Sequence, residues 1–505
     1  MLSVSDKEGI VKLAKGLREH GFKIISSGGT ASHLEENGIK VQKVSEITGF
    51  PEILDGRVKT LHPKIHGGIL HEEEKHKQDI EEHGLPNLDM VVVNLYPFEK
   101  VTKREHDLKE AIKNIDIGGV ALLRAAAKNH DRVTVVTGKE DYDLVLDELA
   151  SKDGVITKKV RKDLALKAFK KTMKYDAAIS EYLHKEFSGE LFPDTINVIG
   201  KKIKDLRYGD NPGQKAVFYK RGDVNESSVT KAEQLHGKQL SYNNILDLEA
   251  ALDIVKEFEE PAVAAIKHTN PTGVATKPKI HDAYQKVYEC DPKSIFGGLI
   301  GSNRKVTAEM AEKMNEIFLE AVIAPQYEQE ALEILKESKN LRIMELPGWK
   351  TDGKNLAHHS VTEGLLVQEK VYHKVDRDDL KIKSSRKPTE EELEAMLFGW
   401  KVVKHVKSNA IVFSKKDHTV GIGAGQMSRV DSVKVAKMKA YLEIDGAIMA
   451  SDAFFPFRDG IDQAADAGIK GVIQPGGSIR DEETIKAAEE NGLSMVFTGQ
   501  RVFKH

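Results

Sequence analysis

The stretch Phe22-Lys23-Ile24-Ile25-Ser26-Ser27-Gly28-Gly29-Thr30 joins a short apolar run to a turn of glycine and hydroxyl residues. The apolar run predicts a strand over residues 22–26, and the residues after Thr30 return to a helical pattern. Upstream, residues 6–20 place apolar side chains at helical spacing and stop at Gly21. A strand between two helices is the repeating unit of an open α/β sheet.

Strand and helix patterns continue to alternate up to about residue 190. Residues 90–95 are apolar for most of their length, as expected of a parallel strand that is covered on both faces. Residues 133–136 predict another strand, and helical patterns occupy residues 105–113, 121–128, 141–149 and 158–187. The breaker cluster at residues 188–193 is interpreted as a linker. We therefore assign residues 1–190 to one α/β domain with an open parallel sheet.

Strands recur in the second half of the chain, which we assign to residues 200–505. They are predicted at residues 262–266, 410–413, 419–422, 448–451 and 471–474, with helices between many of them. A polar stretch at residues 348–359 predicts a boundary between two α/β subdomains near residue 360.

Composition excludes several classes of protein. The 505 residues include 76 Lys and Arg against 79 Asp and Glu, so no basic surplus exists for nucleic acid. The single cysteine, Cys290, excludes an internal disulfide and a thiolate zinc cage. No apolar run approaches the roughly 20 residues that cross a bilayer, and no targeting pattern opens the chain. We expect a cytoplasmic protein that binds neither nucleic acid nor membrane.

Residues 27–30 bring backbone N–H groups and hydroxyls to the start of a helix, an arrangement that binds phosphate. An ordinary strand–helix turn is the alternative, and the turn alone does not decide between them. Because ligands bind beyond the carboxyl ends of strands in open α/β sheets, residues 94–97 and 137–138 are expected at the same edge.

The run Gly56-Arg57-Val58-Lys59-Thr60-Leu61-His62-Pro63 offers two cations and a hydroxyl. It is interpreted either as an anion-binding loop or as a basic surface loop. His62 and His66 have the spacing of a helical metal pair, but Pro63 and the following Gly67-Gly68 argue against a helix. No metal site is expected here.

Residues 116–129 combine a glycine pair with titratable side chains. Gly118 and Gly119 open a helix and offer N–H donors for a developing oxyanion, Asp116 can position a proton, and Lys128 can carry charge or a proton. A capped amphipathic helix explains most of the same pattern.

In the second half, residues 262–266 deliver Lys267 and His268 to the carboxyl end of a strand, and residues 269–273 predict a turn. His268 is the candidate base, because imidazole exchanges protons near neutral pH. An exposed strand end is the alternative. The glycine-rich residues 421–425 lack the dinucleotide fingerprint, which needs glycine where Ser428 stands, so no NAD is expected.

The order of these motifs resembles that of a bifunctional purine biosynthesis family, the aminoimidazole carboxamide ribonucleotide (AICAR) formyltransferase and inosine monophosphate (IMP) cyclohydrolase enzymes. The resemblance rests on residues 3–7, 27–30, 56–63, 94–98 and 116–129 in the first half, and on residues 206–212, 294–298, 421–429, 451–459 and 501–505 in the second.

The resemblance implies a methylglyoxal-synthase-like fold for residues 1–190 and two cytidine-deaminase-like subdomains for residues 200–505. It implies formyl transfer from 10-formyltetrahydrofolate to AICAR, giving formyl-AICAR (FAICAR), and then dehydrating ring closure to IMP. A homodimer with transferase sites at its interface and a structural monovalent cation are further implications. Zinc is not implied, because the deaminase ligand set Pro-Cys-x-x-Cys needs two cysteines.

The resemblance also implies site residues. For ring closure these are Lys59, Tyr96, Asp116 and Lys128, with nucleotide binding by Ser5, Lys7, Ser27, Gly28, Gly29, Thr30, Arg57, Thr60, Asn94, Gly118 and Gly119. For formyl transfer they are His268 as base with Lys267 and Asn409, with the nucleotide held by Arg207, Tyr208, Gly297, Glu320, Phe454 and Arg501, and the folate faced by Arg429, Asp459 and Ser478.

Two departures from the family pattern matter. Gly213 precedes Gln214 where the family usually has histidine, so formyl transfer is expected to be weaker or supported differently. The chain begins at Met1-Leu2-Ser3, where relatives usually have several more residues, so an internal start is one interpretation.

Three functional interpretations stay open at this point. The first is the bifunctional enzyme, which motifs in both halves support. The second keeps only the cyclohydrolase active, and Gly213 is its sole support. The third is a non-catalytic sensor, against which the reactive groups of Lys128, Lys267 and His268 argue.

Overall fold

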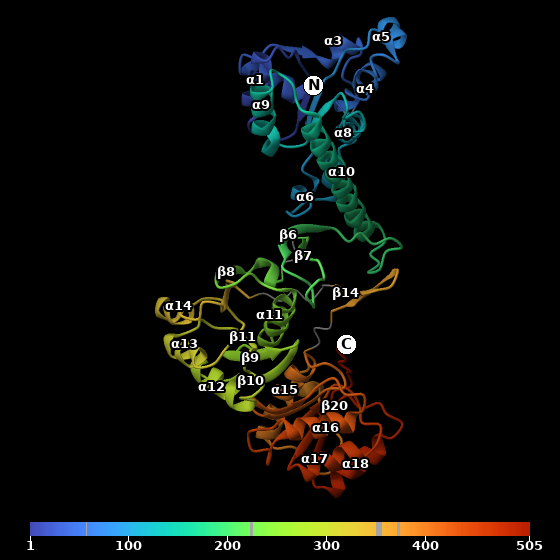
Figure 1. Ribbon diagram of the computed structural model, residues 1–505. Coiled ribbons are helices and arrows are strands. Elements are labelled where there is room, and N and C mark those ends of the chain that lie inside the picture. Colours follow the sequence, from blue (N-terminus) through green and yellow to red (C-terminus); the bar gives the residue numbers. More distant parts are fainter. Residues whose placement is uncertain (57, 223–225, 350–355, 371–373) are drawn as a thin grey trace. The chain divides into compact units, whose positions relative to one another are not determined.

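The computed structural model describes residues 1–56, 58–222, 226–349, 356–370 and 374–505. The chain forms two compact units, Met1–Ile199 and Gly200–His505 (Figure 1). Both units are built from strands and helices, which confirms the α/β class.

The first unit contains a five-stranded parallel sheet with the order β3-β2-β1-β4-β5. Its strands are β1 (Leu2–Val4), β2 (Ile24–Ser26), β3 (Val41–Lys43), β4 (Met90–Asn94) and β5 (Thr134–Val136). Met90 to Val93 are buried, as expected of a strand with both faces covered. The predicted open parallel sheet is confirmed.

Helices cover this sheet, and α8 and α10 pack against each other and against β5. The helices are α1 (Ile10–Glu19), α2 (Gly28–Glu36), α3 (Val44–Thr48), α4 (Pro63–Leu70), α5 (Lys77–His83), α6 (Phe98–Val101), α7 (Leu108–Lys113), α8 (Gly118–Lys128), α9 (Tyr142–Ser151) and α10 (Lys158–Phe187), with short 3₁₀ turns at Leu54–Gly56 and Lys139–Asp141.

Helix α4 corrects one expectation, since the sequence argued against a helix after Pro63. Proline is favourable at the first helical position, where its missing N–H would have no partner within the helix. The His62 ring nitrogen Nδ1 accepts a hydrogen bond from the Lys64 N–H at 3.2 Å and caps the helix. Gly68 lets the chain approach closely, because a Cβ there would lie 2.5 Å from the Pro86 carbonyl oxygen. Gly68, which argued against a helix, therefore allows α4 to pack closely against Pro86.

The second unit contains one continuous sheet of 12 strands in the order β16-β21-β20-β19-β17-β18-β10-β9-β11-β12-β13-β8. The pairing of β10 with β18 joins its two halves. The strands are β8 (Glu233–His236), β9 (Ala262–Lys267), β10 (Asn270–Thr276), β11 (Leu299–Ser302), β12 (Ala321–Ala324), β13 (Arg342–Glu345), β16 (Lys381–Ile382), β17 (Ile411–Lys415), β18 (His418–Gly423), β19 (Ile448–Ser451), β20 (Gly471–Gln474) and β21 (Ser494–Phe497).

Two hairpins lie outside this sheet. One pairs β6 (Gly200–Leu206) with β7 (Ala216–Arg221), and the other pairs β14 (Leu356–Val361) with β15 (Gly364–Glu369). Along the chain, β14 and β15 fall between the strands of the two halves of the large sheet.

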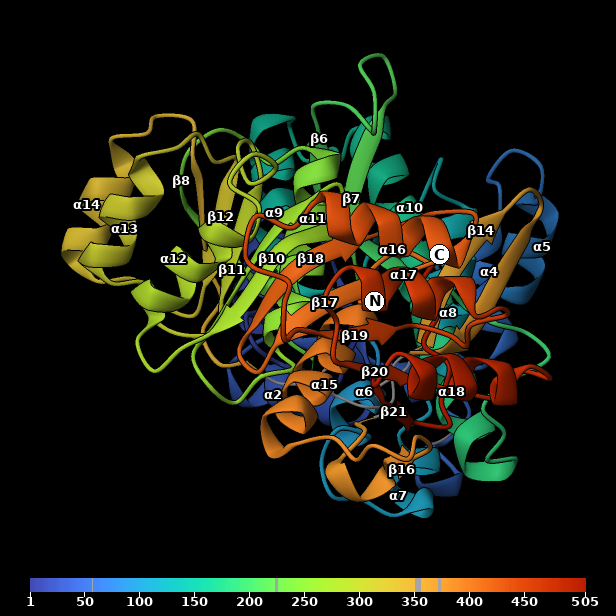
Figure 2. The ribbon, with the colours of Figure 1, turned by 90° about the horizontal axis from the view of Figure 1, so that it is seen from below.

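Apolar side chains point alternately to the two faces of the large sheet. Along β9, Ala262, Ala264 and Ile266 belong to one core, and Val263 and Ala265 belong to another. Helices α11 (Tyr242–Val255) and α15 (Glu390–Val403) cover the first face. The other face is covered by α12 (Ile280–Cys290), α13 (Ala308–Asn315) and α14 (Gln329–Lys336) in one half and by α16 (Arg429–Met438), α17 (Asp459–Asp466) and α18 (Asp481–Glu490) in the other (Figure 2).

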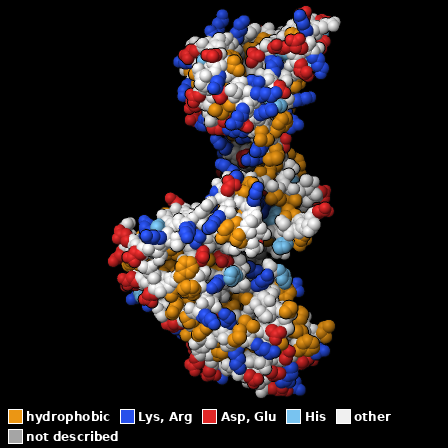
Figure 3. Space-filling view, in the orientation of Figure 1, with side chains coloured by type: hydrophobic (Ala, Val, Ile, Leu, Met, Phe, Trp, Pro, Cys, Tyr) orange, Lys and Arg blue, Asp and Glu red, His pale blue; other side chains and the backbone are white. Residues whose placement is uncertain are grey.

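The face of each unit seen in Figure 3 mixes charges of both signs. Figure 3 shows Lys and Arg side chains interspersed with Asp and Glu on the visible face. Among the described residues, no helix combines the length and the apolar character needed to span a bilayer.

Candidate active sites

The first candidate site lies at the carboxyl ends of the parallel strands of the unit Met1–Ile199. Asn94, the last residue of β4, accepts hydrogen bonds through its Oδ1 atom from the N–H groups of Ser5 at 2.6 Å and Asp6 at 2.9 Å. Its amide nitrogen donates to the Asp6 carbonyl at 2.8 Å. Asn94 thus fixes the loop that follows β1 against the end of β4.

Two ammonium groups converge on the glycine-rich turn that follows β2. The Nζ atom of Lys59 lies 2.7 Å from the place where a Cβ on Gly28 would stand, and that of Lys7 lies 3.6 Å from the corresponding place on Gly29. The Gly28 N–H donates to Glu52 Oε1 at 3.0 Å, so a carboxylate also faces the turn. A helix start with two nearby cations suits a phosphate group.

The hydroxyl residues of this turn have different surroundings. Thr30 exchanges hydrogen bonds with the backbone N–H and carbonyl of Val4, both at 3.0 Å, and so joins α2 to β1. Ser27 is buried, and its hydroxyl has no hydrogen-bond partner among the residues that the structure describes. Thr60 Oγ1 lies 2.9 Å from where a Cβ on Gly118 would stand, which places it at the start of α8. Arg57 lies outside the described residues.

Asp116 lies just before α8 and connects three parts of the site. Its Oδ1 atom accepts a hydrogen bond from the Gly119 N–H at 2.7 Å, and its Oδ2 atom accepts one from the Tyr96 N–H at 3.3 Å. Its own N–H donates to the Tyr175 hydroxyl at 2.9 Å. Burial raises the pKa of Asp116, against the opposing effects of these N–H groups and of the Lys59 charge. A carboxyl with a raised pKa is suited to proton transfer.

The hydrogen bond between Asp116 and Gly119 affects one of the two predicted oxyanion donors, the N–H groups of Gly118 and Gly119. Because the Gly119 N–H donates to Asp116, its use by an oxyanion requires that this hydrogen bond break. Tyr96 shares the environment of Asp116, since burial and the Asp116 charge both raise its pKa.

Lys128 is not brought next to Asp116. It is exposed and is the last residue of α8. At a rise of 1.5 Å per residue, roughly 15 Å of helix separate its backbone from that of Gly118. Its role in ring closure stays a prediction.

The second candidate site lies at one edge of the 12-stranded sheet. The carboxyl end of β9 pairs with the beginnings of β10 and β11, and β12 begins beside β11. In the other half, the beginning of β17 pairs with the carboxyl ends of β18 and β19. Strand register therefore gathers segments that lie far apart in the sequence.

His268 lies in a tight turn between β9 and β10. Lys267 pairs with Asn270, so the turn consists of His268 and Thr269, which have positive φ angles of 54° and 62°. The predicted turn over residues 269–273 is therefore correct only at Thr269, because residues 270–273 belong to β10. The Thr269 N–H donates to the Asp247 carboxylate of α11 at 2.6 Å.

Lys267 connects this turn to the segment before β11 and β12. Its ammonium donates to the Phe296 carbonyl at 2.7 Å, and the neighbouring Gly297 N–H donates to the Phe318 carbonyl at 2.8 Å. Glu320 accepts hydrogen bonds from Arg342 at 2.8 Å and from Asn244 at 3.2 Å. Lys267, Gly297 and Glu320 thus occupy one region beside the turn.

Asn409 is held in the same region by contacts on both sides of its carboxamide. Its nitrogen donates to the carbonyls of Gln426 at 2.9 Å and Met427 at 3.2 Å, and its oxygen accepts from Arg429 at 2.9 Å. Arg429 is buried and also contacts Asp452. Its guanidinium therefore bonds to Asn409, Ser451 and Asp452 within the protein.

Glycines near Asn409 serve helix packing. A Cβ on Gly423 would lie 1.9 Å from the Ser432 carbonyl oxygen of α16, and one on Gly421 would lie 2.2 Å from that of Ala436. The glycine-rich residues 421–425 therefore allow α16 to pack directly on β18.

The remaining predicted residues fall into two groups. Phe454, Asp459 and Ser478 follow β19 and β20 at the same sheet edge, and the Val502 N–H next to Arg501 donates to the Asp452 carbonyl at 2.9 Å. Arg207 and Tyr208 follow β6, where the guanidinium lies 5.4 Å from the tyrosine ring centre. A cavity of about 320 Å³ there is lined by Arg207, Gly213 and Gln214, among others.

Sequence reasoning missed two carboxylates of this site. Asp452 lies within residues 451–459 that carried the resemblance, and its buried pairing with Arg429 depends on the fold. Asp247 lies within the apolar pattern of α11, where no local signal separates it from an ordinary helical residue. In the part of the chain that the structure describes, no group of three or more His, Cys, Asp or Glu side chains is placed to hold a metal.

Two family models match successive parts of this chain. Residues 9–121 match the MGS-like domain, and residues 126–439 match the AICARFT/IMPCHase bienzyme family. Two relatives named "Bifunctional purine biosynthesis protein PurH", from Bacillus mycoides (strain KBAB4) and Bacillus cereus (strain B4264), are each 53% identical over 100% of this chain and 99% of theirs. A solved structure, "Crystal structure of ForH", is 36% identical over 36% of this chain and 97% of its own, with a TM-score of 0.32. The chain belongs to the AICARFT/IMPCHase bienzyme family.

Proposed function

We propose that this protein catalyses the last two steps of IMP synthesis, formyl transfer to AICAR and ring closure of the product FAICAR. The observation that carries the proposal is the 53% identity to bifunctional purine biosynthesis relatives along the whole chain. We assign ring closure to the unit Met1–Ile199 and formyl transfer to the unit Gly200–His505.

Formyl transfer moves one carbon between two nitrogens. The AICAR amine attacks the formyl carbon of 10-formyltetrahydrofolate and a new C–N bond forms. The bond to the folate nitrogen then breaks, the amine loses a proton, and the folate nitrogen gains one. We assign the proton to His268, with Lys267 and Asn409 positioned to stabilise charge on the formyl oxygen. The gathering of these residues at one sheet edge supports the assignment.

Ring closure joins two groups of one molecule. The carboxamide nitrogen of FAICAR attacks the formyl carbon, and a water molecule is then lost. Because both groups are already in one molecule, the protein needs mainly to hold the reactive conformer and to move protons. We assign proton movement to Asp116 and Lys128, phosphate binding to the turn of Ser27 to Thr30 with Lys7, and charge stabilisation to Lys59.

Further properties are proposed from the family resemblance. The protein is expected to act in the cytoplasm as a homodimer with its transferase sites at the subunit interface. Folate contact by Arg429, Asp459 and Ser478, nucleotide contact by Arg57, and a structural monovalent cation belong to the same proposal.

Separate measurements of the two reactions test the proposed function. Purified protein given AICAR and 10-formyltetrahydrofolate should release tetrahydrofolate and form IMP, and protein given FAICAR alone should form IMP. IMP from FAICAR without tetrahydrofolate release would leave a cyclohydrolase with an inactive second unit. Binding of nucleotide without either product would leave a sensor.

A further inference from the structure

The turn that carries His268 has a backbone that its residues do not favour. His268 and Thr269 both adopt left-handed φ angles, 54° and 62°, in a two-residue turn between β9 and β10. Two-residue hairpin turns of this kind prefer asparagine or aspartate followed by glycine. Threonine is branched at Cβ, and such residues rarely adopt positive φ. Contacts from outside the hairpin are therefore expected to hold the turn.

Asp247 supplies such a contact from a rigid element. Its carboxylate accepts the Thr269 N–H at 2.6 Å, and the side chain belongs to a residue that is only 8% exposed. Helix α11, which carries Asp247, packs on β9 and β11 and begins at a capping box formed by Ser241 and Asn244. Burial raises the pKa of Asp247, and the N–H groups of Thr269 and His268 and the His268 charge oppose this rise. The carboxylate thus lies beside both turn residues.

The opposite side of the turn is fastened to the loop that carries Asn409. The Asn270 carboxamide nitrogen donates to the His268 carbonyl at 3.1 Å, and its oxygen accepts the Lys407 N–H at 2.9 Å. A shift of the turn would therefore change the separation of His268 from Asn409. Losses of about 100-fold in rate can follow from a misplacement of 1 Å.

We propose that Asp247 is a positioning residue for formyl transfer, which holds the left-handed His268-Thr269 turn and thereby aims the His268 ring at the reacting amine. This role rests on the proposed function of the second unit. Asp247 acts on the backbone of the turn and touches no reacting atom.

Substitution of Asp247 tests the role. Asp247→Ala should lower kcat for formyl transfer by at least about 30-fold, with KM for AICAR changed by less than about 3-fold, because the turn moves while the nucleotide contacts stay. Asp247→Asn should retain kcat within about 5-fold of the unmodified protein, since its amide oxygen still accepts the N–H. Ring closure of FAICAR in the same variants should be unchanged, which also shows that the first unit is folded.

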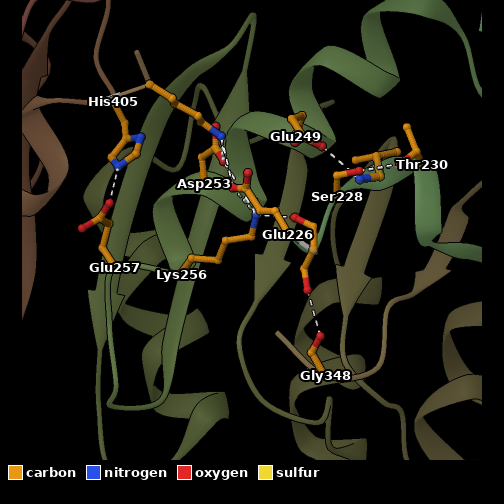
Figure 4. Close-up of polar contacts among 12 residues, drawn as sticks. Glu226, Ser228, Thr230, Glu249, Asp253, Lys256, Glu257, Gly348 and His405 are labelled. Carbon is orange, nitrogen blue, oxygen red and sulfur yellow. Dashed lines mark hydrogen bonds and ion pairs between the residues drawn. The ribbon is translucent and has the colours of Figure 1, made fainter. Parts of the chain in front are cut away.

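Glu249 offers a matched control on the same helix. Its carboxylate also accepts a backbone N–H, that of Val229 at 2.9 Å, and it lies near Ser228 and Thr230 (Figure 4). Burial raises the pKa of Glu249 as it does that of Asp247. Glu249→Ala should therefore lower the thermal stability of the protein but leave kcat for formyl transfer within about 3-fold.

A second substitution separates positioning from any direct chemistry of the carboxylate. Thr269→Gly removes the penalty for a positive φ at that residue. In the Asp247→Ala background it should recover at least about 10-fold of the lost kcat, because the turn then forms without an outside acceptor. A structural loss elsewhere in the unit would not be repaired by this change.

The possible results are distinct. Asp247→Ala with unchanged kcat overturns the role, and so does a low kcat that Thr269→Gly fails to raise. If Asp247→Ala does not fold, an Asp247→Asn protein with kcat as low as that of His268→Ala overturns it. Absence of formyl transfer in the unmodified protein overturns the proposed function, and the positioning role with it.

Discussion

The carboxyl group of Asp116 gives the most direct residue-scale test of ring closure. Asp116→Asn should lower kcat for IMP formation from FAICAR by about 100-fold or more, because the amide cannot exchange the proton that the carboxyl carries. The fold should persist, since the asparagine oxygen can still accept the Gly119 N–H that Asp116 accepts at 2.7 Å. Asp131→Asn is the control, because Asp131 is an exposed aspartate paired with Lys158. Equal loss of rate in both variants would contradict a role for Asp116.

Gly28 tests whether the turn after β2 binds phosphate. Gly28→Ala places a Cβ 2.7 Å from the Lys59 ammonium at a residue with φ of 50°. The displaced lysine should raise KM for FAICAR about 10-fold while formyl transfer is unchanged. Gly38→Ala is a matched control, since Gly38 has φ of 75° and nothing within 4 Å of its Cβ position. Both variants carry the same kind of backbone penalty, so only Gly28→Ala should change KM.

At the scale of elements, the pattern of apolar residues predicted helices and strands whose bounds depend on nearby sequence. Residues 158–187, 448–451 and 471–474 match α10, β19 and β20 within the same bounds. Breakers follow two of these elements, Ser188-Gly189 after α10 and Pro475-Gly476 after β20. Helix α4 was missed, since the packing partner of Gly68 is contributed by Pro86.

In the candidate sites, too, local sequence predicted some features, and others depend on residues that are distant in the sequence. The cluster around Asp116 lies beside parallel strands whose carboxyl ends meet, which alternation of strands and helices predicts. The cluster around Lys267 lies where the carboxyl end of β9 meets the beginnings of β10 and β11, an antiparallel pairing that the alternation does not predict. The exact turn at His268 depends on Asp247, 21 residues earlier and on another element. Lys128 lies far from Asp116 because most of helix α8 separates them. The motif of residues 116–129 does not reveal this separation.

The loop between β6 and β7 carries the main departure from the family pattern. Gly213 lines the cavity beside Arg207 and has open space at its Cβ position, but its φ of 94° disfavours a side chain. Gly213→His should alter kcat or KM for formyl transfer by about 3-fold or more, because a donor then enters the cavity, at a backbone cost of roughly 1 kcal/mol. Ring closure should not change. Identical folate-dependent kinetics in Gly213→His and the unmodified protein would show that residue 213 has no influence on formyl transfer.

At the scale of the whole molecule, buried charge in the second unit links stability to pH. Glu257 lies between Lys404 at 2.6 Å and His405 at 3.1 Å (Figure 4 shows the contact with His405). Burial alone would raise the pKa of Glu257, but its hydrogen bonds and charge interactions with His405 and Lys404 lower it to about 2. Burial lowers the pKa of His405.

The sign of the pH effect follows from the direction of the Glu257 shift. Because the pKa in the folded protein lies below the ordinary value of 4.5, the carboxylate stabilises the fold above pH 4.5 and this contribution is lost as the pH falls toward 2. Glu257→Gln should destabilise the second unit at pH 7, and its deficit relative to the unmodified protein should shrink by about 1.4 kcal/mol at about pH 3.5. Urea unfolding followed by tryptophan fluorescence measures this unit alone, since Trp349 and Trp400 are the two tryptophans of the chain. A deficit of equal size at both pH values would show that Glu257 gains no stability from its charge.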